Sequence, residues 1–540
     1  MEKRLIIAVV LSIGVLYAYS FMFPQAKPLP ANPSAAKQEQ VAVASAPVQG
    51  GAVQPAAAAA APQASVPGTP QQVVNAHDIT VETDLYTAVF STQGAGLKKL
   101  TLKKYHETPD KNGKNIVMVD ESNPGRYGLL SDSREFGIAP AAVFTSSAEN
   151  LKLGSGSKGS IEFTTTTPQG VQFKKTYSFA GDAYRIALTE EVKNAGAAKV
   201  DGTLHLLQND RVIAFKKGEG RYEVYGPSVL SDDKVNNDKL DNIQKAPVQY
   251  DKGVLWAAFS DKYFVDAILG EKGSIASVRL SHPGTDSLVT DITSPAISVA
   301  PGQSASVAYS LYIGPKDLDI LKAQGSRLEE VINYGWFAPV SKPLIFALKF
   351  LYKYTGNYGF AIIIITVILK MLFFPLTHKS YKSMKEMQKL QPKMAELKEK
   401  FKNDRDAMNK AVMELYKTHK VNPMGGCLPM VVQIPVFFGL YRALMYSIEL
   451  RHAPFILWIT DLSAKDPYYV TPIVMGVTMF IQQKMTPSNM DPVQAKMMLA
   501  LPVVFTFMFL SFPSGLVVYW LVNNVLTIAQ QMYINKSINA

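Results

Sequence analysis

Apolar and polar positions follow two different patterns along the chain, and the pattern changes near residue 335. Before that point, short segments alternate apolar with polar or small residues, as in Val307 to Ile313, and clusters of Gly, Asn, Asp and Pro separate them. Such segments are typical of β-strands joined by turns. After that point, long apolar runs alternate with short polar pieces, as in helices that cross a membrane. The pattern predicts a β-rich domain over 75–325 and a helical membrane domain over 341–540.

The β-rich domain is expected to be a large β-sandwich, because many short strands with turn signals are spread over about 240 residues. Within it, LWAAFSDKYFVDAIL at 255–269 predicts a strongly buried pair of strands. The domain contains no metalloprotease, nucleophile-elbow, phosphate-loop or dinucleotide motif, and its histidines are scattered. Nothing in the domain indicates catalysis, so we expect no enzyme; a binding cleft stays open as an alternative.

Six membrane crossings are predicted. The first is the apolar run Leu5 to Phe23, which follows Lys3 and Arg4 and forms an N-terminal anchor at 1–23. Cleavage after Ser20, as in a signal peptide, is the alternative, but signal peptides usually have a shorter apolar core. The remaining runs are Gly359–Leu376, Leu428–Tyr446, Val470–Ile481, Leu499–Phe512 and Leu516–Tyr533.

Two segments connect these parts. Residues 24–74 consist largely of Ala, Pro, Gln, Val and Ser with almost no charge, and no apolar period could bury a face, so a disordered linker is predicted. Residues 326–340 place apolar residues at three- and four-residue spacing and contain Trp336 and Phe337. This spacing predicts an amphipathic helix on the membrane surface. Packing of the same helix against the β-domain is the alternative.

The distribution of charge predicts how the chain is oriented. Residues 377–427 are rich in lysine, whereas 447–469 contain Arg451 and Lys465 as their only Lys or Arg residues. Basic loops stay in the cytoplasm, so the first loop is expected inside and the second outside. Both termini are then cytoplasmic, and the β-domain lies outside the cytoplasm.

Composition agrees with a membrane protein and excludes several other classes. Hydrophobic residues make up 47% of the chain and charged residues 18%. The net charge of +11 is concentrated beside the apolar runs, so it does not indicate nucleic-acid binding. Cys427 is the single cysteine, which excludes a disulfide framework and paired-cysteine metal sites. No metal or other cofactor is expected.

The loop at 377–427 contains apolar residues at alternating three- and four-residue spacing on both sides of Asn403 and Asp404. Two short antiparallel helices, a cytoplasmic helical hairpin, are therefore predicted, with a kink at Pro392. Their methionine-rich stripes most simply pack on each other. An adaptable surface for varied apolar segments is the alternative.

Lys370 lies inside the apolar run at 359–376. A lysine in the middle of a membrane helix costs roughly 2.5–3.5 kcal/mol, so it usually faces a wet cavity or a partner. Snorkelling of its long side chain to the headgroups is the alternative. The polar residues in the apolar runs also include Thr366, Gln433, Trp520, Asn523, Asn524 and Thr527. Each alone is also explained by a hydrogen bond between helices, but together with Lys370 they indicate a shared polar surface.

Residues 356–533 resemble the YidC family of membrane protein insertases. The resemblance is carried by GNYGFAIIIITVILKMLFFPLT, LQPKM, YKTHKVNPMGGCLPMVVQIPVFFGLY, ELRHAPFILWITDLSAKDPYYV, PIVMGVTMFIQQKM and FPSGLVVYWLVNN. The anchor, linker and β-domain resemble the Gram-negative form of the family, whose periplasmic domain is a β-supersandwich.

The resemblance implies a groove formed by five core helices, open to the cytoplasm and the lipid and closed toward the outside. Lys370 matches the positively charged position of that groove, where the family usually has arginine. Gln433 and Trp520 match other positions that line it, and Thr366 and Tyr519 are expected to contact substrate beside them.

An insertase and membrane chaperone of the bacterial inner membrane is the function implied. Its expected partners are nascent membrane proteins, the Sec translocon, membrane lipids, and the ribosome and signal recognition machinery through the cytoplasmic loops. A solute transporter with Lys370 in an anion site is the alternative, but the repeated halves common in transporters are not visible. An intramembrane enzyme would need a nucleophile with its base, or metal ligands, and the apolar runs contain no such set.

Overall fold

The computed structural model describes residues 76–539, apart from 111, 213–224, 285, 402–403, 420, 422–427 and 487–491. The predicted anchor at 1–23, the linker at 24–74 and Cys427 lie outside the described residues. Residues 392–419 belong to one compact unit and the β-domain and remaining helices to another, so the two are described separately.

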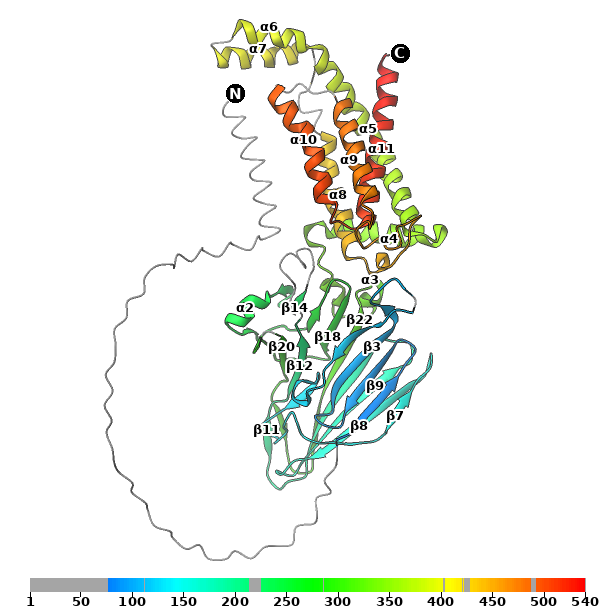
Figure 1. Ribbon diagram of the computed structural model, residues 1–540. Coiled ribbons are helices and arrows are strands. Elements are labelled where there is room, and N and C mark those ends of the chain that lie inside the picture. Colours follow the sequence, from blue (N-terminus) through cyan, green and yellow to red (C-terminus); the bar gives the residue numbers. More distant parts are fainter. Residues whose placement is uncertain are drawn as a thin grey trace, which may run out of the picture. The chain divides into compact units, whose positions relative to one another are not determined.

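The larger layer of the β-domain is an antiparallel nine-stranded sheet (Figure 1). Its strands, in spatial order, are β15 (Lys234–Asn237), β14 (Gly226–Ser231), β17 (Trp256–Ser260), β18 (Phe264–Gly270), β22 (Ser304–Pro315), β10 (Arg185–Asn194), β9 (Val171–Ala180), β8 (Lys158–Thr166) and β6 (Thr145–Ser146). The buried strand pair predicted at 255–269 is confirmed as β17 and β18, in which Trp256 pairs with Leu269.

Two five-stranded sheets form the second layer. One contains β4 (Asn115–Asp120), β3 (Gly96–His106), β2 (Tyr86–Ser91), β1 (Asp78–Glu82) and β7 (Asn150–Lys152). The other contains β16 (Val248–Tyr250), β19 (Ser277–Ser281), β20 (Ser287–Thr293), β12 (His205–Arg211) and β5 (Leu130–Asp132). The remaining elements are the β11 (Val200–Gly202) and β21 (Ile297–Val299) ribbon, the 3-10 turn η1 (Pro124–Arg126) and α2 (Leu240–Lys245).

Both small sheets cover the same face of the nine-stranded sheet. In β9, alternate residues from Val171 to Phe179 are buried, as expected for a strand with one face in the core. From the first small sheet, the Phe90 ring lies 4.6 Å from the ring of Tyr177 in β9. From the second, Ser131 donates a hydrogen bond to Glu190, which is paired across the ladder with Lys175 on that same face of β9. The domain is therefore the β-sandwich that the alternating pattern predicts.

The helix predicted over 326–340 begins later in the chain. That stretch instead forms two 3-10 turns, η2 (Leu328–Val331) and η3 (Gly335–Phe337), because Arg327 and Gly335 adopt left-handed φ angles of 59° and 58° that interrupt an α-helix. The amphipathic helix is α4 (Ala338–Thr355), which follows α3 (Leu318–Ala323) and the turns. It buries Leu344, Ile345 and Leu348 and exposes Phe346, Phe350 and Tyr354.

Five further helices form a bundle, in which α5, α9 and α11 lie side by side (Figure 1). They are α5 (Tyr358–Lys389), α8 (Leu428–Tyr446), α9 (Val470–Met485), α10 (Pro492–Phe509) and α11 (Ser514–Asn539). The loop at 447–469 contains the short turn η4 (Ile448–Leu450) and connects α8 to α9. Each run predicted as a crossing after residue 350 thus lies in one of these helices, except that α10 ends at Phe509 and the run predicted to Phe512 is not helical over its last three residues.

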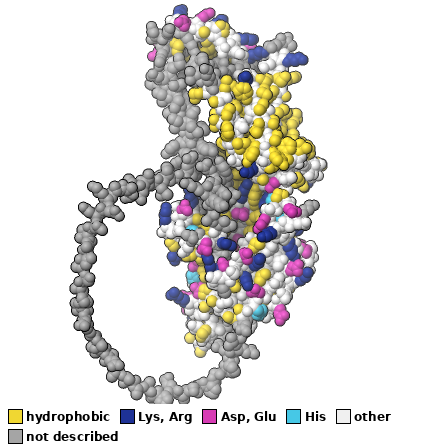
Figure 2. All heavy atoms as spheres, viewed as in Figure 1, with side chains coloured by type: hydrophobic (Ala, Val, Ile, Leu, Met, Phe, Trp, Pro, Cys, Tyr) yellow, Lys and Arg dark blue, Asp and Glu magenta, His cyan; other side chains and the backbone are white. Residues whose placement is uncertain are grey.

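Apolar side chains gather on the outside of this bundle, whereas charged side chains are scattered over the β-domain (Figure 2). Leu372 is 69% exposed and Phe507 is 70% exposed. Among the described helices, α5 is long and apolar enough to cross a membrane, and α8 and α10 contain the shorter apolar stretches Val431–Tyr446 and Met497–Phe509. The count of six crossings stays a prediction.

Residues 392–419 contain a helical hairpin made of α6 (Gln391–Lys400) and α7 (Arg405–Thr418). The Tyr416 hydroxyl lies 3.3 Å from Met394 Sδ, which brings the end of α7 beside the start of α6 and makes the two helices antiparallel. Pro392 stands in the first turn of α6, after α5 has ended at Lys389, so the predicted kink is a break between two helices. The cytoplasmic position of the hairpin stays a prediction.

Candidate substrate groove

A pocket lies among three helices of the bundle. Residues from α5, α8 and α11 line it: Thr366, Leu369, Lys370, Phe373, Thr377, Gln433, Val436, Tyr519 and Asn523. The pocket thus brings together four of the five predicted site residues, although Gln433 is 63 positions from Lys370 in the sequence and Tyr519 is 149 positions from it.

The α5 wall of the pocket follows from helical spacing. Thr366, Lys370, Phe373 and Thr377 stand four, three and four residues apart, so they share one face of the helix. The two threonine hydroxyls donate to carbonyls of their own helix, Thr366 to Ile362 at 2.6 Å and Thr377 to Phe373 at 3.0 Å. Lys370 is therefore the polar side chain of this face that reaches another helix.

The Lys370 ammonium has one hydrogen bond among the described residues. Its Nζ donates to Thr527 Oγ1 at 2.7 Å, and that hydroxyl donates in turn to the Asn523 carbonyl at 2.6 Å. In the part of the chain that the structure describes, no carboxylate forms an ion pair with Lys370. An ammonium has three N–H donors, so two of them are left to bind water or an anionic group that enters the pocket.

Gln433 of α8 and Asn523 of α11 line the pocket from the two other helices. Gln433 Nε2 donates to Asn523 Oδ1 at 3.1 Å, which joins α8 to α11 across the pocket. Further along α11, Asn524 Nδ2 donates to Thr478 Oγ1 at 3.3 Å and Gln531 donates to the Met485 carbonyl, both on α9. Polar residues of α11 therefore serve two purposes, because some line the pocket and others hold the helices together.

Comparison with known proteins supports one family over the whole chain. Residues 78–347 match the family described as the YidC periplasmic domain, and residues 350–540 match the family described as the 60Kd inner membrane protein. The membrane protein insertase YidC of Citrifermentans bemidjiense is 70% identical over 100% of both chains, and that of Geotalea uraniireducens is 63% identical over 100% of both chains. The chain belongs to the YidC family of membrane protein insertases.

A solved structure described as an active YidC insertase with its first transmembrane domain resolved is 17% identical to this chain. It covers 83% of this chain and 90% of its own, with a TM-score of 0.35. Membership of the YidC family therefore rests on the sequence relatives and the two family matches, which confirm the resemblance drawn from the sequence.

Trp520 is the one predicted groove residue of this YidC-family chain that does not line the pocket. Its ring packs edge-on against Phe437 at 4.6 Å and lies 5.0 Å from Phe509, between helices α8, α10 and α11. Tyr519 and Asn523 are four residues apart and share the pocket face, whereas Trp520 is turned by one helical position, about 100° away. In this structure Trp520 packs helices together, and its contact with substrate stays a prediction.

Asn523, which was predicted as part of the shared polar surface, lines the pocket. Four further lining residues were not predicted: Leu369, Phe373, Thr377 and Val436. Helical spacing from Lys370 could have found Phe373 and Thr377, and spacing from Gln433 could have found Val436. Among the described residues no cluster of three or more His, Cys, Asp or Glu side chains could hold a metal ion.

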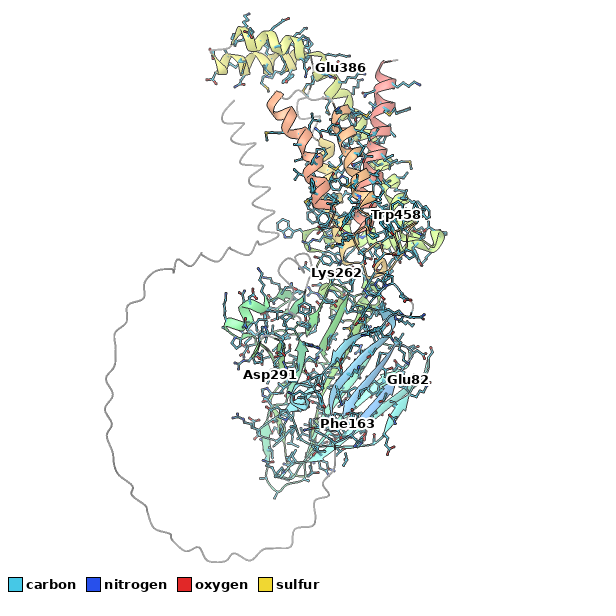
Figure 3. All side chains as sticks on the ribbon, viewed as in Figure 1. Glu82, Phe163, Lys262, Asp291, Glu386 and Trp458 are labelled. Carbon is cyan, nitrogen blue, oxygen red and sulfur yellow. The ribbon has the colours of Figure 1, made fainter. Side chains whose placement is uncertain are left out.

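The α8–α9 loop covers the N-terminal ends of the two helices that hold Lys370 and Thr527. Asn357 caps α5 and donates through Nδ2 to the Phe455 carbonyl at 2.9 Å, while the Ser514 amide at the start of α11 donates to the Ala464 carbonyl at 2.7 Å. Trp458 in this loop and Glu386 near the end of α5 lie at opposite ends of the bundle (Figure 3). The loop thus contacts the N-terminal ends of both α5 and α11.

Proposed function

We propose that this chain inserts newly made proteins into the bacterial inner membrane and assists their folding there. The pocket at Lys370 is the groove through which the polar flank of a client segment passes. The observation that carries this proposal is the Lys370 ammonium, which stands in a polar pocket with a single hydrogen bond and no ion pair among the described residues.

The energetic obstacle to insertion is the polar flank of the client and not its apolar segment. Leu, Ile, Phe and Val each favour the membrane by several tenths of a kcal/mol, so an apolar helix enters lipid without help. Each charged residue at the bilayer centre costs about 2.5–3.5 kcal/mol or more. A polar pocket in the bundle shortens the dehydrated path and lowers that cost.

Lys370 gives the groove a preference for acidic flanks. Because two of its N–H donors have no partner among the described residues, its ammonium attracts a carboxylate of the client into the pocket. The membrane potential, negative inside, then favours outward movement of that carboxylate by about 2.3 kcal/mol per charge for each 100 mV. Together, partition into lipid and the potential supply the driving force without a nucleotide.

In this proposal both termini and the α6–α7 hairpin lie in the cytoplasm, and the β-domain lies in the periplasm. The lysine-rich segment 377–427 supports that orientation through the positive-inside rule. The hairpin is then placed to meet the ribosome and the signal recognition machinery, while the membrane helices act alone or beside the Sec translocon. Exposed Phe346, Phe350 and Tyr354 suit α4 to lie on the outer membrane surface.

The test compares Lys370→Ala and Lys370→Arg in an insertion assay at equal protein level. The clients are single-span proteins with an acidic or a neutral flank. Lys370→Ala should lower insertion of the acidic client several-fold and that of the neutral client little, because each lost charge contact is worth on the order of 1 kcal/mol. Lys370→Arg should restore insertion, since it keeps the charge.

Lys382→Ala is the matched control, because it removes one exposed lysine from the same helix outside the pocket. Equal insertion of the acidic client by Lys370→Ala and by the unchanged protein would refute the role given to Lys370. A loss of small-anion uptake with unchanged client insertion would instead support a transporter.

A further inference from the structure

The ammonium of Lys349 in α4 is surrounded by three carboxylates from two other segments. Asp317 and Asp319, at the start of α3 directly after β22, lie against it, with 3.3 Å between Nζ and Asp317 Oδ2. Glu449, in the α8–α9 loop, places Oε1 3.1 Å from the same nitrogen. The Asp317 and Glu449 side chains are 19% and 12% exposed, so water screens these contacts only in part.

The three carboxylates stabilise the positive charge of Lys349. Burial alone lowers its pKa, but the hydrogen bond to Asp319 and the charges of Glu449 and Asp317 outweigh burial and raise the pKa above its usual range. Lys349 therefore stays charged. Without it, the Asp317 and Glu449 carboxylates would face one another in a largely buried space, beside the 71% exposed Asp319, and their repulsion would separate α3 from the loop.

Arg451, two residues after Glu449, joins the same loop to the β-domain at a second point. Its Nη2 donates to the His106 carbonyl at the end of β3 at 2.6 Å. The guanidinium also lies 5.8 Å from the ring centre of Tyr263 and 5.5 Å from that of Phe264, at the turn between β17 and β18. Cation–π contacts at this distance are favourable, so Arg451 holds the loop against two strands.

The loop fastened in this way is the one that covers the ends of α5 and α11. Besides the contacts of Asn357 and Ser514 described above, the Gly515 amide donates to the Leu462 carbonyl at 2.8 Å. A displacement of the loop would thus free the ends of the two helices that hold Lys370 and Thr527.

We infer that Lys349 and Arg451 are positioning residues that fasten the α8–α9 loop to the end of the β-domain and so keep the periplasmic end of the groove closed. The inference rests on the proposed function, because closure has a purpose only where the groove opens to the cytoplasm. It assigns the β-domain a part in insertion: it braces the loop that seals the groove.

The test measures access to the groove from outside with a single reporter cysteine. Thr366→Cys is introduced into a Cys427→Ser background, and a membrane-impermeant maleimide is added to spheroplasts. We expect Lys349→Met to raise the labelling rate by on the order of tenfold. Arg451→Gln should act in the same direction, and Lys349→Arg should label as slowly as the Lys349 protein does.

A triple variant separates fastening from the repulsion of unpaired carboxylates. Asp317→Asn, Lys349→Met and Glu449→Gln together leave near-isosteric neutral groups, and the amide introduced by Asp317→Asn can still cap α3. We expect this variant also to label faster and to show faster hydrogen exchange in 447–469, with exchange in β9 and β10 unchanged.

If Lys349→Met and the triple variant label as slowly as the unchanged protein at equal protein level, the inference is refuted. The proposed function is not affected by that result, since the assay contains no client. Rapid outside labelling already in the Lys349 protein would overturn both this inference and a groove closed toward the periplasm.

Discussion

Asp210 in β12 and Asp266 in β18 form a buried carboxylate pair where the second small sheet meets the nine-stranded sheet. Their exposed fractions are 8% and 7%. Gln208 Nε2 donates to Asp266 Oδ2 at 2.7 Å and to Asp210 Oδ1 at 3.3 Å. Burial raises the pKa of Asp210 to about 7, and burial together with the charge of Asp210 raises the pKa of Asp266 well above its usual value. The pair is therefore protonated in the folded domain at mildly acidic pH.

Because the pKa values of the two aspartates are raised in the folded state, the pair contributes its full stabilisation below the pKa of the unfolded chain, near pH 4. That stabilisation is lost as pH rises through the pKa of the folded domain. We predict that the free energy of unfolding of the β-domain falls by a few kcal/mol between pH 4 and pH 8, since a tenfold change in proton affinity is worth about 1.4 kcal/mol. Hydrogen exchange of β12 and β18 in the full chain, followed against pH, measures this.

In the double variant Asp210→Asn and Asp266→Asn, the free energy of unfolding should fall less between pH 4 and pH 8, because neither side chain can then ionise. Asp84→Asn, which changes an exposed aspartate, is the matched control and should follow the unchanged protein. An identical pH dependence in the double variant and in the control would contradict the assignment.

The residues of the groove could be predicted only in part from the sequence. Lys370 stands out because charge is costly inside an apolar run, and Thr366 follows by helical spacing. Thr527 was visible as a polar residue in its span but not as the partner of Lys370, because the two are 157 positions apart and only packing of α5 against α11 brings them together. Trp520 matches a groove position in sequence, yet it lies one position after Tyr519, about 100° around α11, and therefore packs between helices.

At the scale of elements, Gly359 sets how closely the α8–α9 loop approaches α5. A Cβ atom there would lie 1.9 Å from Phe455 Cδ2, well inside contact distance. We predict that Gly359→Ala displaces Phe455 and destabilises the loop by about 1–3 kcal/mol, as overpacking usually does. Thermal unfolding in detergent and hydrogen exchange of 447–469 measure the effect.

Gly359→Ala combined with Phe455→Leu is the control, since the smaller side chain leaves room for the added methyl group. It should recover most of the lost stability. If Gly359→Ala alone has the same thermal stability as the unchanged protein, Phe455 does not lie as close to Gly359 as described.

Apolar length and strand alternation predict most elements but not their order in space. The five runs after residue 350 are helices, because an apolar run of this length has few other stable forms. The order of strands in the nine-stranded sheet could not be predicted, since β22 lies between β18 and β10, which are far from one another in sequence. The helix predicted at 326–340 was misplaced because apolar spacing does not reveal the left-handed residues that interrupt it.

At the scale of the whole molecule, the exposed apolar side chains of the bundle require a lipid surround. Val504 in α10 is 62% exposed. We predict that Val504→Lys lowers the amount of protein in the membrane fraction, because lysine at the bilayer centre costs roughly 2.5–3.5 kcal/mol. Val117→Lys, at a 39% exposed position in the β-domain, should leave that amount unchanged. Equal membrane content of both variants would place Val504 outside the lipid.

Site-specific photo-cross-linking to a nascent membrane protein tests the groove most directly. A photoreactive side chain at Asn523, which lines the pocket, is compared with one at Val525, which is 48% exposed and lies about 200° around α11. We predict that nascent chains cross-link at 523 much more than at 525, and that Lys370→Ala reduces the cross-link at 523. Equal cross-linking at both positions, or a stronger cross-link at 525, would contradict passage of clients through this groove.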